Sequence, residues 1–137
     1  MDIEQHLIER GIKPTAMRTL VFRTLSQARS PQSLRDIEDT LITAERSTIF
    51  RALTLLVSHH LVHTIEDGSG ALKYEVCMSH DHNSFDDHHP HFYCEHCGRT
   101  FCLHDERIPR INLPDSYQVH SINFVIKGIC PDCTSKA

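Results

Sequence analysis

Hydrophobic side chains recur every three or four residues through the first 60 positions, which is the period of an α-helix. The pattern predicts four short helices. Gly11 can end the first, and Pro14 suits the first turn of the second. Ser33 with Asp36 resembles a capping box for the third, and Ser47 can cap the fourth. The apolar positions of the four helices are, in order, Ile3, Leu7 and Ile8; Met17, Leu20, Val21 and Leu25; Leu34, Ile37 and Leu41; and Ile49, Phe50, Leu53, Leu56 and Val57.

The period then changes to that of β-strands. The runs LVHTI and LKYEV flank a glycine-containing connection, EDGSGA, and this arrangement predicts a hairpin. Helices followed by a hairpin are the plan of a winged helix-turn-helix. Residues 78–88 are polar and lack a period, which indicates a hinge or linker. Beyond them we expect strands around 89–93 and 118–127, with a brief helix near 104–111.

The predicted fold is therefore α+β, with three parts. A winged helix-turn-helix that binds DNA is expected over residues 1–77, a hinge or linker over 78–88, and a small metal-binding α/β domain over 89–137. The chain has 137 residues, which suits one domain or two small ones. No apolar run approaches the roughly 18 residues that a membrane span needs, and the N-terminus has no signal-peptide pattern. We therefore expect a cytoplasmic protein with no membrane partner.

Charge is distributed unevenly between the two halves. Residues 1–65 carry eight Lys and Arg against seven Asp and Glu, or +1, and residues 66–137 carry six against eleven, or −5, which together give the net charge of −4. Any binding to a polyanion should therefore be local and use the first half. Histidine is concentrated as well, because seven of the twelve lie between His80 and His104.

Cysteine spacing predicts a structural zinc site. Cytoplasmic thiols stay reduced, so six cysteines indicate metal ligands rather than disulfides. Cys94 and Cys97 form one CxxC pair, and Cys130 and Cys133 form another. Two such knuckles complete a closed tetrahedral site of four thiolates, which suits Zn²⁺ and leaves no open position for chemistry. The alternative, a thioredoxin-like dithiol, would need a single pair in a βαβ frame.

A second set of metal ligands remains after the four cysteines are assigned. His89 and His91 would point to one face of a strand, whereas His63 and Cys77 lie on the two arms of the hairpin. These four residues make a plausible tetrahedral N₃S set that favours Zn²⁺ and would draw ligands from both halves of the chain. A metal ion there would act as a sensor by fixing the halves together. Simpler interpretations are a surface His63, a buried apolar Cys77 and a solvated, weakly metal-binding histidine tract.

The whole chain resembles the ferric-uptake-regulator (Fur) superfamily of bacterial metal-responsive repressors. The stretch IKPTAMR is similar to the opening LKxTxxR of that family, and RSTIFRAL to its recognition-helix signature, which usually has Tyr-Arg. HHPHFYCEHCG and the final GICPDC complete the resemblance. It implies a homodimer whose second domain mediates dimerisation, and which represses metal-uptake genes when its sensory metal is bound.

Within that family, the chain is most similar to zinc-uptake regulators (Zur). Iron-type members have one Glu at the position of Glu75 and another at the position of Cys102. This chain therefore has the first of these two glutamates and lacks the second. Zinc-type members use an acid or His in the wing, a Cys after the hairpin and a His-x-His pair. His63, Cys77, His89 and His91 match that pattern, and an iron-responsive repressor is the alternative. Some family members have an additional metal site, and here Pro90 and Ile122 replace two of its ligands. That site is therefore either lost or rebuilt from His88 and His120. Together with the two positions compared above, the possible extra metal ligands are Glu75, His88, Cys102 and His120.

The fourth helix is expected to read double-stranded operator DNA in the major groove. Arg51 can donate to guanine or phosphate, whereas Phe50 can make only apolar contacts, such as with a thymine methyl group, unless it is part of the core. Phosphate anchoring is expected from Lys13, Arg18 and Arg46, unless these side chains form only a solvated face. The DNA-binding candidates are Lys13, Arg18, Arg46, Ser47, Thr48, Phe50 and Arg51.

Two other classes of protein compete with a regulator. A zinc metalloenzyme would need an open zinc and a base, for which the sequence offers only Glu75 and His104, and it has no HExxH, deaminase or phosphate-loop motif. A zinc buffer would use the histidine tract but has no need of a winged helix. The sequence therefore favours a regulator that is not an enzyme and binds no small-molecule substrate, with structural Zn²⁺ and a regulatory Zn²⁺ or, failing that, Fe²⁺.

Overall fold

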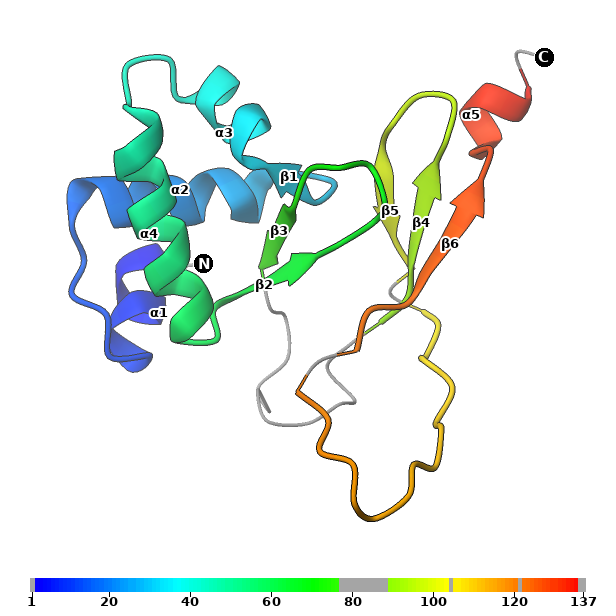
Figure 1. Cartoon of the computed structure of the whole chain (residues 1–137). Coiled ribbons are helices and arrows are strands. Elements are labelled where there is room, and N and C mark those ends of the chain that lie inside the picture. Colours follow the sequence, from blue (N-terminus) through cyan, green and yellow to red (C-terminus); the bar gives the residue numbers. More distant parts are fainter. Residues whose placement is uncertain (1, 77–88, 104, 121, 136–137) are drawn as a thin grey trace. The chain divides into compact units, whose positions relative to one another are not determined.

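The chain forms two compact units in the computed structural model, Met1–Met78 and Ser79–Ala137 (Figure 1). The structure describes residues 2–76, 89–103, 105–120 and 122–135, so the predicted hinge over 78–88 lies outside the described residues. The mixed helix and sheet content confirms the predicted α+β class. No helix in the described residues is long and apolar enough to span a membrane.

The first unit contains the four predicted helices. Their bounds are Ile3–Glu9 for α1, Ala16–Gln27 for α2, Leu34–Thr40 for α3 and Arg46–Ser58 for α4. One face of each helix is buried in a common core, which explains why the apolar period was readable in the sequence. The fully buried side chains of the helices include Leu7, Val21, Phe22, Ile37, Ile49, Leu53 and Leu56.

Two helix ends differ from the prediction. Helix α2 begins after Thr15, whose hydroxyl accepts from the Arg18 amide, so Pro14 precedes the helix. The expected cap at Ser47 is wrong, because α4 begins at Arg46. The carbonyl of Glu45 already accepts from the amide of Ile49 at 3.0 Å, which places Ser47 inside the first turn.

A three-stranded sheet follows the helices in the order β1-β3-β2. The predicted hairpin is formed by β2, Val62–Ile65, and β3, Lys73–Val76, with Val62 opposite Val76. Strand β1, Gln32–Ser33, was not predicted; it pairs with β3 through Tyr74 and Lys73. Two residues are too few to show an alternating pattern, so only the pairing partner reveals this strand. Helices and sheet together make the first unit a winged helix-turn-helix.

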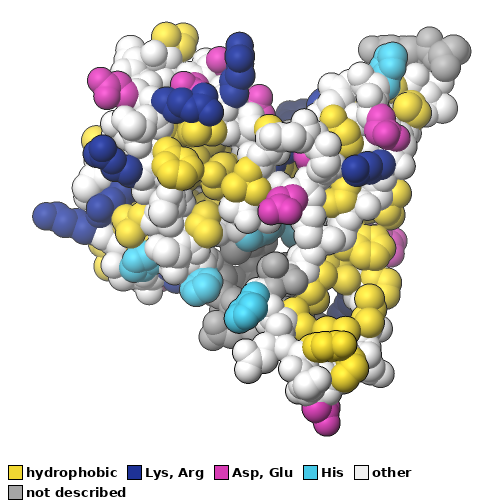
Figure 2. All heavy atoms as spheres, viewed as in Figure 1, with side chains coloured by type: hydrophobic (Ala, Val, Ile, Leu, Met, Phe, Trp, Pro, Cys, Tyr) yellow, Lys and Arg dark blue, Asp and Glu magenta, His cyan; other side chains and the backbone are white. Residues whose placement is uncertain are grey.

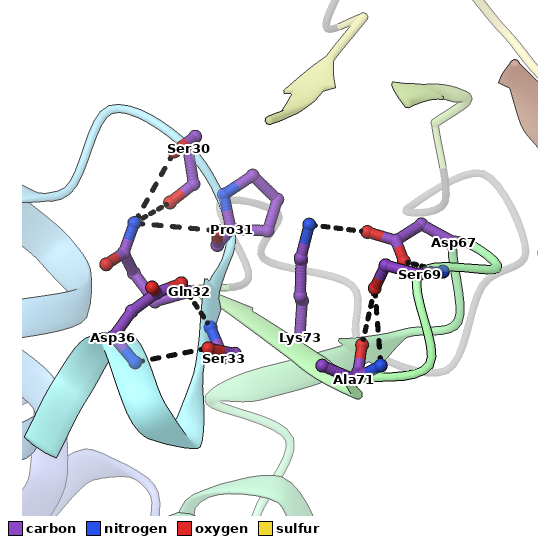
Figure 3. A network of polar contacts seen from close by, with 9 residues as sticks. All are labelled: Ser30, Pro31, Gln32, Ser33, Asp36, Asp67, Ser69, Ala71 and Lys73. Atoms are coloured by element: carbon purple, nitrogen blue, oxygen red, sulfur yellow. Dashed lines mark hydrogen bonds and ion pairs between the residues drawn. The ribbon is translucent and has the colours of Figure 1, made fainter. Parts of the chain in front are cut away.

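The hairpin loop is fixed by a buried ion pair. Lys73 Nζ lies 2.8 Å from Asp67 Oδ2, and the two side chains are only 8% and 0% exposed (Figure 3). The Asp67 carboxylate also accepts from the Ser69 amide at 2.9 Å. A carboxylate that is buried and doubly engaged holds the loop in one conformation, which suits a wing that has to meet a ligand in a fixed position.

The capping box of α3 supplies a stability prediction. Ser33 Oγ accepts from the Asp36 amide at 3.1 Å, and the Asp36 carboxylate accepts from the Ser33 amide at 2.9 Å (Figure 3). Ser33→Ala leaves the first of these amides without its acceptor and should lower the free energy of unfolding by about 1 kcal/mol. Ser47→Ala is the matched control, because that serine is exposed and caps nothing. Urea denaturation of both variants measures the difference, and equal losses would contradict the assignment.

The second unit is built on a sheet with the order β5-β4-β6. Strand β4, His91–Cys94, is antiparallel to β5, Thr100–Cys102, and parallel to β6, Val125–Gly128. A four-residue helix, α5, covers Pro131–Thr134. The predicted strand over 118–127 is therefore limited to its end, and the predicted strand over 89–93 begins two residues late.

The helix predicted near 104–111 is wrong over the part that the structure describes, 105–111, which is irregular. Pro109 lies inside this segment and cannot donate the backbone hydrogen bond of a helix, and Pro114 follows closely. Ile111 and Leu113 consequently have no helical face to bury them and are 78% and 48% exposed. Yellow hydrophobic areas are visible on the surface of the second unit in Figure 2. The exposed large hydrophobic residues of the second unit are Ile111, Leu113, Tyr117, Val119, Ile122, Ile126 and Ile129.

Candidate metal centres and nucleic-acid interface

The four paired cysteines converge at one end of the second sheet. Cys94 is the last residue of β4, and Cys130 caps the N-terminus of α5. Their four sulfur atoms all lie within 4.8 Å of one another, with 3.8 Å between Cys97 Sγ and Cys130 Sγ. Cys94 and Cys130 are fully buried, whereas Cys97 is exposed. The cluster has the composition and compactness of a closed tetrahedral zinc site.

Backbone amides donate hydrogen bonds to the buried sulfur of Cys94 and favour its ionised form, which binds a metal ion. Burial raises the pKa of this thiol, but the amides of Cys97, Cys130 and His96 oppose that effect and lower the pKa to about 6. The sulfur accepts from the Cys97 amide at 3.4 Å and from the Cys130 amide at 3.3 Å. Hydrogen bonds to the ionised form stabilise it, so these amides favour the thiolate that a metal requires. These donors fit Zn²⁺, which would be held by the four thiolates with no open coordination position.

Arg99, which the sequence analysis did not single out, lies beside this cluster. Its Nε donates to Cys97 Sγ at 3.4 Å, and its guanidinium forms an ion pair of 3.0 Å with Asp132. The hydrogen bond from Arg99 is the main cause of a lowered pKa at Cys97. The sequence does contain a signal for this ion pair. Arg99 follows the first CxxC pair by two positions, and Asp132 lies inside the second pair.

The hairpin of the first unit carries two potential ligands side by side. His63 on β2 is paired in register with Glu75 on β3, and His63 Nε2 lies 3.3 Å from Glu75 Oε2. Both side chains are partly buried, at 25% and 14% exposure. In metal sites, a carboxylate hydrogen-bonded to one ring nitrogen of a histidine ligand fixes the orientation of that ring. Cys77, the sulfur ligand predicted for this end of the hairpin, lies outside the described residues.

The second unit carries another pair, His89 and His91. Their ring centroids are 4.9 Å apart, and His91 is buried at 5% exposure as the first residue of β4. Cys102 on β5 is the register partner of His91. Of the remaining possible ligands, His88 lies outside the described residues, and His120 is exposed in the irregular segment before β6.

Helix α4 presents an exposed face beside its buried one. Phe50 is 50% exposed, so it is not a core residue, and Ser47 and Arg51 are exposed as well. Thr48 is partly buried. Exposed Lys and Arg side chains, in dark blue, stand out from the visible face of the helical unit in Figure 2. Such a face combines hydrogen-bond donors, an aromatic ring and positive charge, which are the elements of base and phosphate contacts in a groove.

The three basic anchors predicted from the sequence differ in their surroundings. Lys13 is exposed, and its carbonyl accepts from Arg18 Nη1 at 2.9 Å, so Arg18 also stabilises the loop before α2. Arg46 lies 2.6 Å from Glu38 of α3 while its side chain is 63% exposed. Arg46 therefore joins α3 to the start of α4, and contact with a phosphate would have to compete with this ion pair.

Comparison with known proteins agrees with this architecture. The sequence model described as "Ferric uptake regulator family" matches residues 9–127. The ferric uptake regulation protein of Campylobacter jejuni subsp. jejuni serotype O:2 is 24% identical over 140 residues, covering 95% of this chain and 85% of that protein.

Solved structures with the same fold include regulators of two metals. The Vibrio cholerae ferric uptake regulator superposes with a TM-score of 0.68 at 20% identity, covering 94% of this chain and 100% of that one. A zinc uptake regulator complexed with zinc and DNA gives a TM-score of 0.66 at 19% identity, covering 97% and 91%. At these identities the similarity establishes the fold, and the metal has to be argued from the residues of this chain.

Proposed function

Since the chain belongs to the ferric uptake regulator family of metal-responsive regulators, we propose that it is a zinc-dependent transcriptional repressor. In this proposal the zinc-loaded protein binds operator DNA as a homodimer and controls genes for metal uptake. It acts in the cytoplasm, where the DNA lies, and needs no catalytic group and no small-molecule substrate. The observation that carries the proposal is a DNA-reading fold joined to a unit with its own cysteine and histidine ligands.

The sensory ligands in this proposal are His63, Cys77, His89 and His91. Neither the hairpin pair nor the histidine pair alone supplies the four ligands of a tetrahedral zinc. An ion that takes ligands from both units would restrict their relative motion and favour the arrangement that binds DNA. Glu75 supports the set by accepting a hydrogen bond from His63 Nε2 at 3.3 Å, which orients the ring.

In this proposal α4 is the recognition helix, and its exposed face contacts the operator DNA. Arg51 would donate to a guanine edge or a phosphate, and Phe50 would contact a thymine methyl group. Ser47 and Thr48, in the first turn, and the basic residues Lys13, Arg18 and Arg46 would contact the DNA backbone and fix the helix in the groove. A symmetric dimer would carry two such helices, so we expect an operator with inverted half-sites.

Dimer formation is assigned to the second unit. Seven large hydrophobic side chains are exposed among the described residues of this unit, from Ile111 with 78% exposure to Ile122 with 37%. Exposed apolar side chains that gather into a patch are typical of interaction surfaces. A dimer formed through this unit would carry two copies of the first unit, one for each half-site.

An iron-responsive repressor is the second candidate, and Glu75 favours it. A carboxylate is a harder ligand than a thiolate, so a site completed by Glu75 would suit Fe²⁺ better than one completed by Cys77. The two candidates differ in which residue is essential. Cys77→Ser should abolish the metal response of a zinc sensor and Glu75→Gln should only weaken it, whereas an iron sensor would give the reverse order.

The proposed function is tested by metal-dependent retention of DNA. Genomic fragments selected by the zinc-loaded protein should be shifted on a gel by that protein and released when a chelator removes the regulatory zinc. Arg51→Met should weaken the binding by about 1–3 kcal/mol, the contribution of a good base contact. Arg23→Met, an exposed arginine of α2, is the matched control. Equal binding with and without zinc would contradict the proposal.

A further inference from the structure

The positively charged side chain of Arg99 lies against the four-cysteine cluster. The Arg99 guanidinium donates to Cys97 Sγ from Nε at 3.4 Å and to Cys130 Sγ from Nη2 at 3.8 Å, so it contacts one sulfur of each CxxC pair. The same Nη2 lies 3.0 Å from Asp132, which is inside the second pair. The guanidinium carbon also lies 5.1 Å from the centre of the Phe101 ring. Arg99 is thus held from three directions although its side chain is 49% exposed.

The negative charge of the zinc-loaded four-cysteine site favours a positively charged side chain beside it. Four thiolates around Zn²⁺ leave the centre with two negative charges in excess. A guanidinium next to the sulfurs offsets part of that charge, and its N–H groups engage sulfur lone pairs that would otherwise attack electrophiles or accept protons. Cys97 benefits most, because it is the one exposed cysteine of the four.

We propose that Arg99 is a positioning residue of the four-cysteine site that slows the loss of zinc and protects the sulfur of Cys97. It works in two ways. Its hydrogen bonds reduce the reactivity of the Cys97 thiolate, and its ion pair with Asp132 joins the two knuckles by a link that does not involve the metal. A ligand that leaves the zinc momentarily is therefore held close enough to return.

The test compares zinc release from full-length protein. Wild type and Arg99→Met are loaded with one zinc in the four-cysteine site and mixed with a chromophoric chelator. We expect Arg99→Met to release this zinc about ten-fold faster, because loss of an outer partner of a metal ligand typically lowers metal affinity by about 10- to 100-fold. Arg107→Met, an exposed arginine of the same unit, is the control and should release zinc at the wild-type rate.

Alkylation of the zinc-loaded protein separates this role from a general loosening of the fold. The first cysteine modified by iodoacetamide is identified by mass spectrometry. Arg99→Met should accelerate reaction at Cys97 while Cys133 and Cys102 keep their wild-type rates, because only Cys97 loses its strong donor. A variant that merely unfolds the unit would expose all three together, and this pattern would overturn the proposal.

Two further variants separate the contributions of the positive charge of Arg99, its planar guanidinium group and its ion pair with Asp132. Arg99→Lys keeps the positive charge without the planar fork and should recover part of both losses. Asp132→Asn removes the ion pair and should accelerate zinc release by less than Arg99→Met does. Wild-type release and wild-type Cys97 alkylation in Arg99→Met would overturn the inference, and neither result depends on whether the regulatory metal is zinc or iron.

Discussion

Replacement of Cys94 by serine is expected to remove one zinc per chain and to unfold the second unit while the first unit stays folded. The described part of the second unit buries only Pro90, His91, Cys94, Thr100 and Cys130. None of these is a large hydrophobic side chain, so the described part of the unit has almost no hydrophobic core. A structural zinc contributes about 10–16 kcal/mol in small metal-dependent folds, far more than these residues can replace.

Hydrogen exchange and metal analysis measure this effect. In Cys94→Ser, amides of β4, β5 and β6 should lose their protection, whereas those of α2 and α4 should keep theirs. Cys102→Ser is the matched control, because Cys102 pairs with His91 at the opposite end of β4 from Cys94. It should leave the zinc of the four-cysteine cluster and the amide protection unchanged. Retention of the zinc and of the β4 protection in Cys94→Ser would show that the cluster does not hold the fold.

Replacement of His91 by alanine is expected to abolish the metal response while the four-cysteine zinc remains. If metal moves the protein from about 1:99 to 99:1 in favour of the DNA-binding form, it must favour that form by about 5.5 kcal/mol. A zinc that lacks one of four ligands is bound too weakly to provide this difference. At a zinc concentration that saturates wild type, operator affinity should fall by as much as about 100-fold.

The design of this experiment separates sensing from folding. His91→Ala should still carry one zinc per chain and retain the amide protection of β5 and β6. His120→Ala is the control, since this exposed histidine would be a ligand only of an additional site; it should leave the zinc dependence intact. A His91→Ala protein that binds operator with the zinc dependence of wild type would remove the histidine pair from the sensor.

The first unit could be predicted from its sequence because its stability comes from hydrophobic packing. Ile37, Ile49 and Leu53 are buried at helical intervals, and Ser33 with Asp36 marks a helix start by its own hydrogen bonds. The exceptions are local. A serine at position 47 satisfies the pattern of a cap, but backbone bonding already starts at Glu45.

The second unit could be predicted only where metal ligands mark it. The cysteine spacing identified the four-sulfur cluster, yet the strands and the irregular segment that contains Pro109 were located poorly. Ligand geometry replaces a core in this unit, and so the apolar period that reveals secondary structure is weak. The contact of Arg99 with Cys97 joins two residues near in sequence, but its link to Asp132 spans 33 positions and follows from the fold alone.

Strand β4 has a consequence for the order in which the protein matures. Its first residue, His91, is a proposed sensory ligand, and its last, Cys94, belongs to the four-cysteine cluster. The strand is only four residues long, so we expect the anchoring of its end by the structural zinc to help fix its start. A newly synthesised chain should therefore acquire its structural ion before it can respond to a second one. In the zinc-dependent repressor proposed above, chains made during severe zinc starvation would therefore not bind the operator, and repression would respond only to zinc in excess of what the structural sites take up.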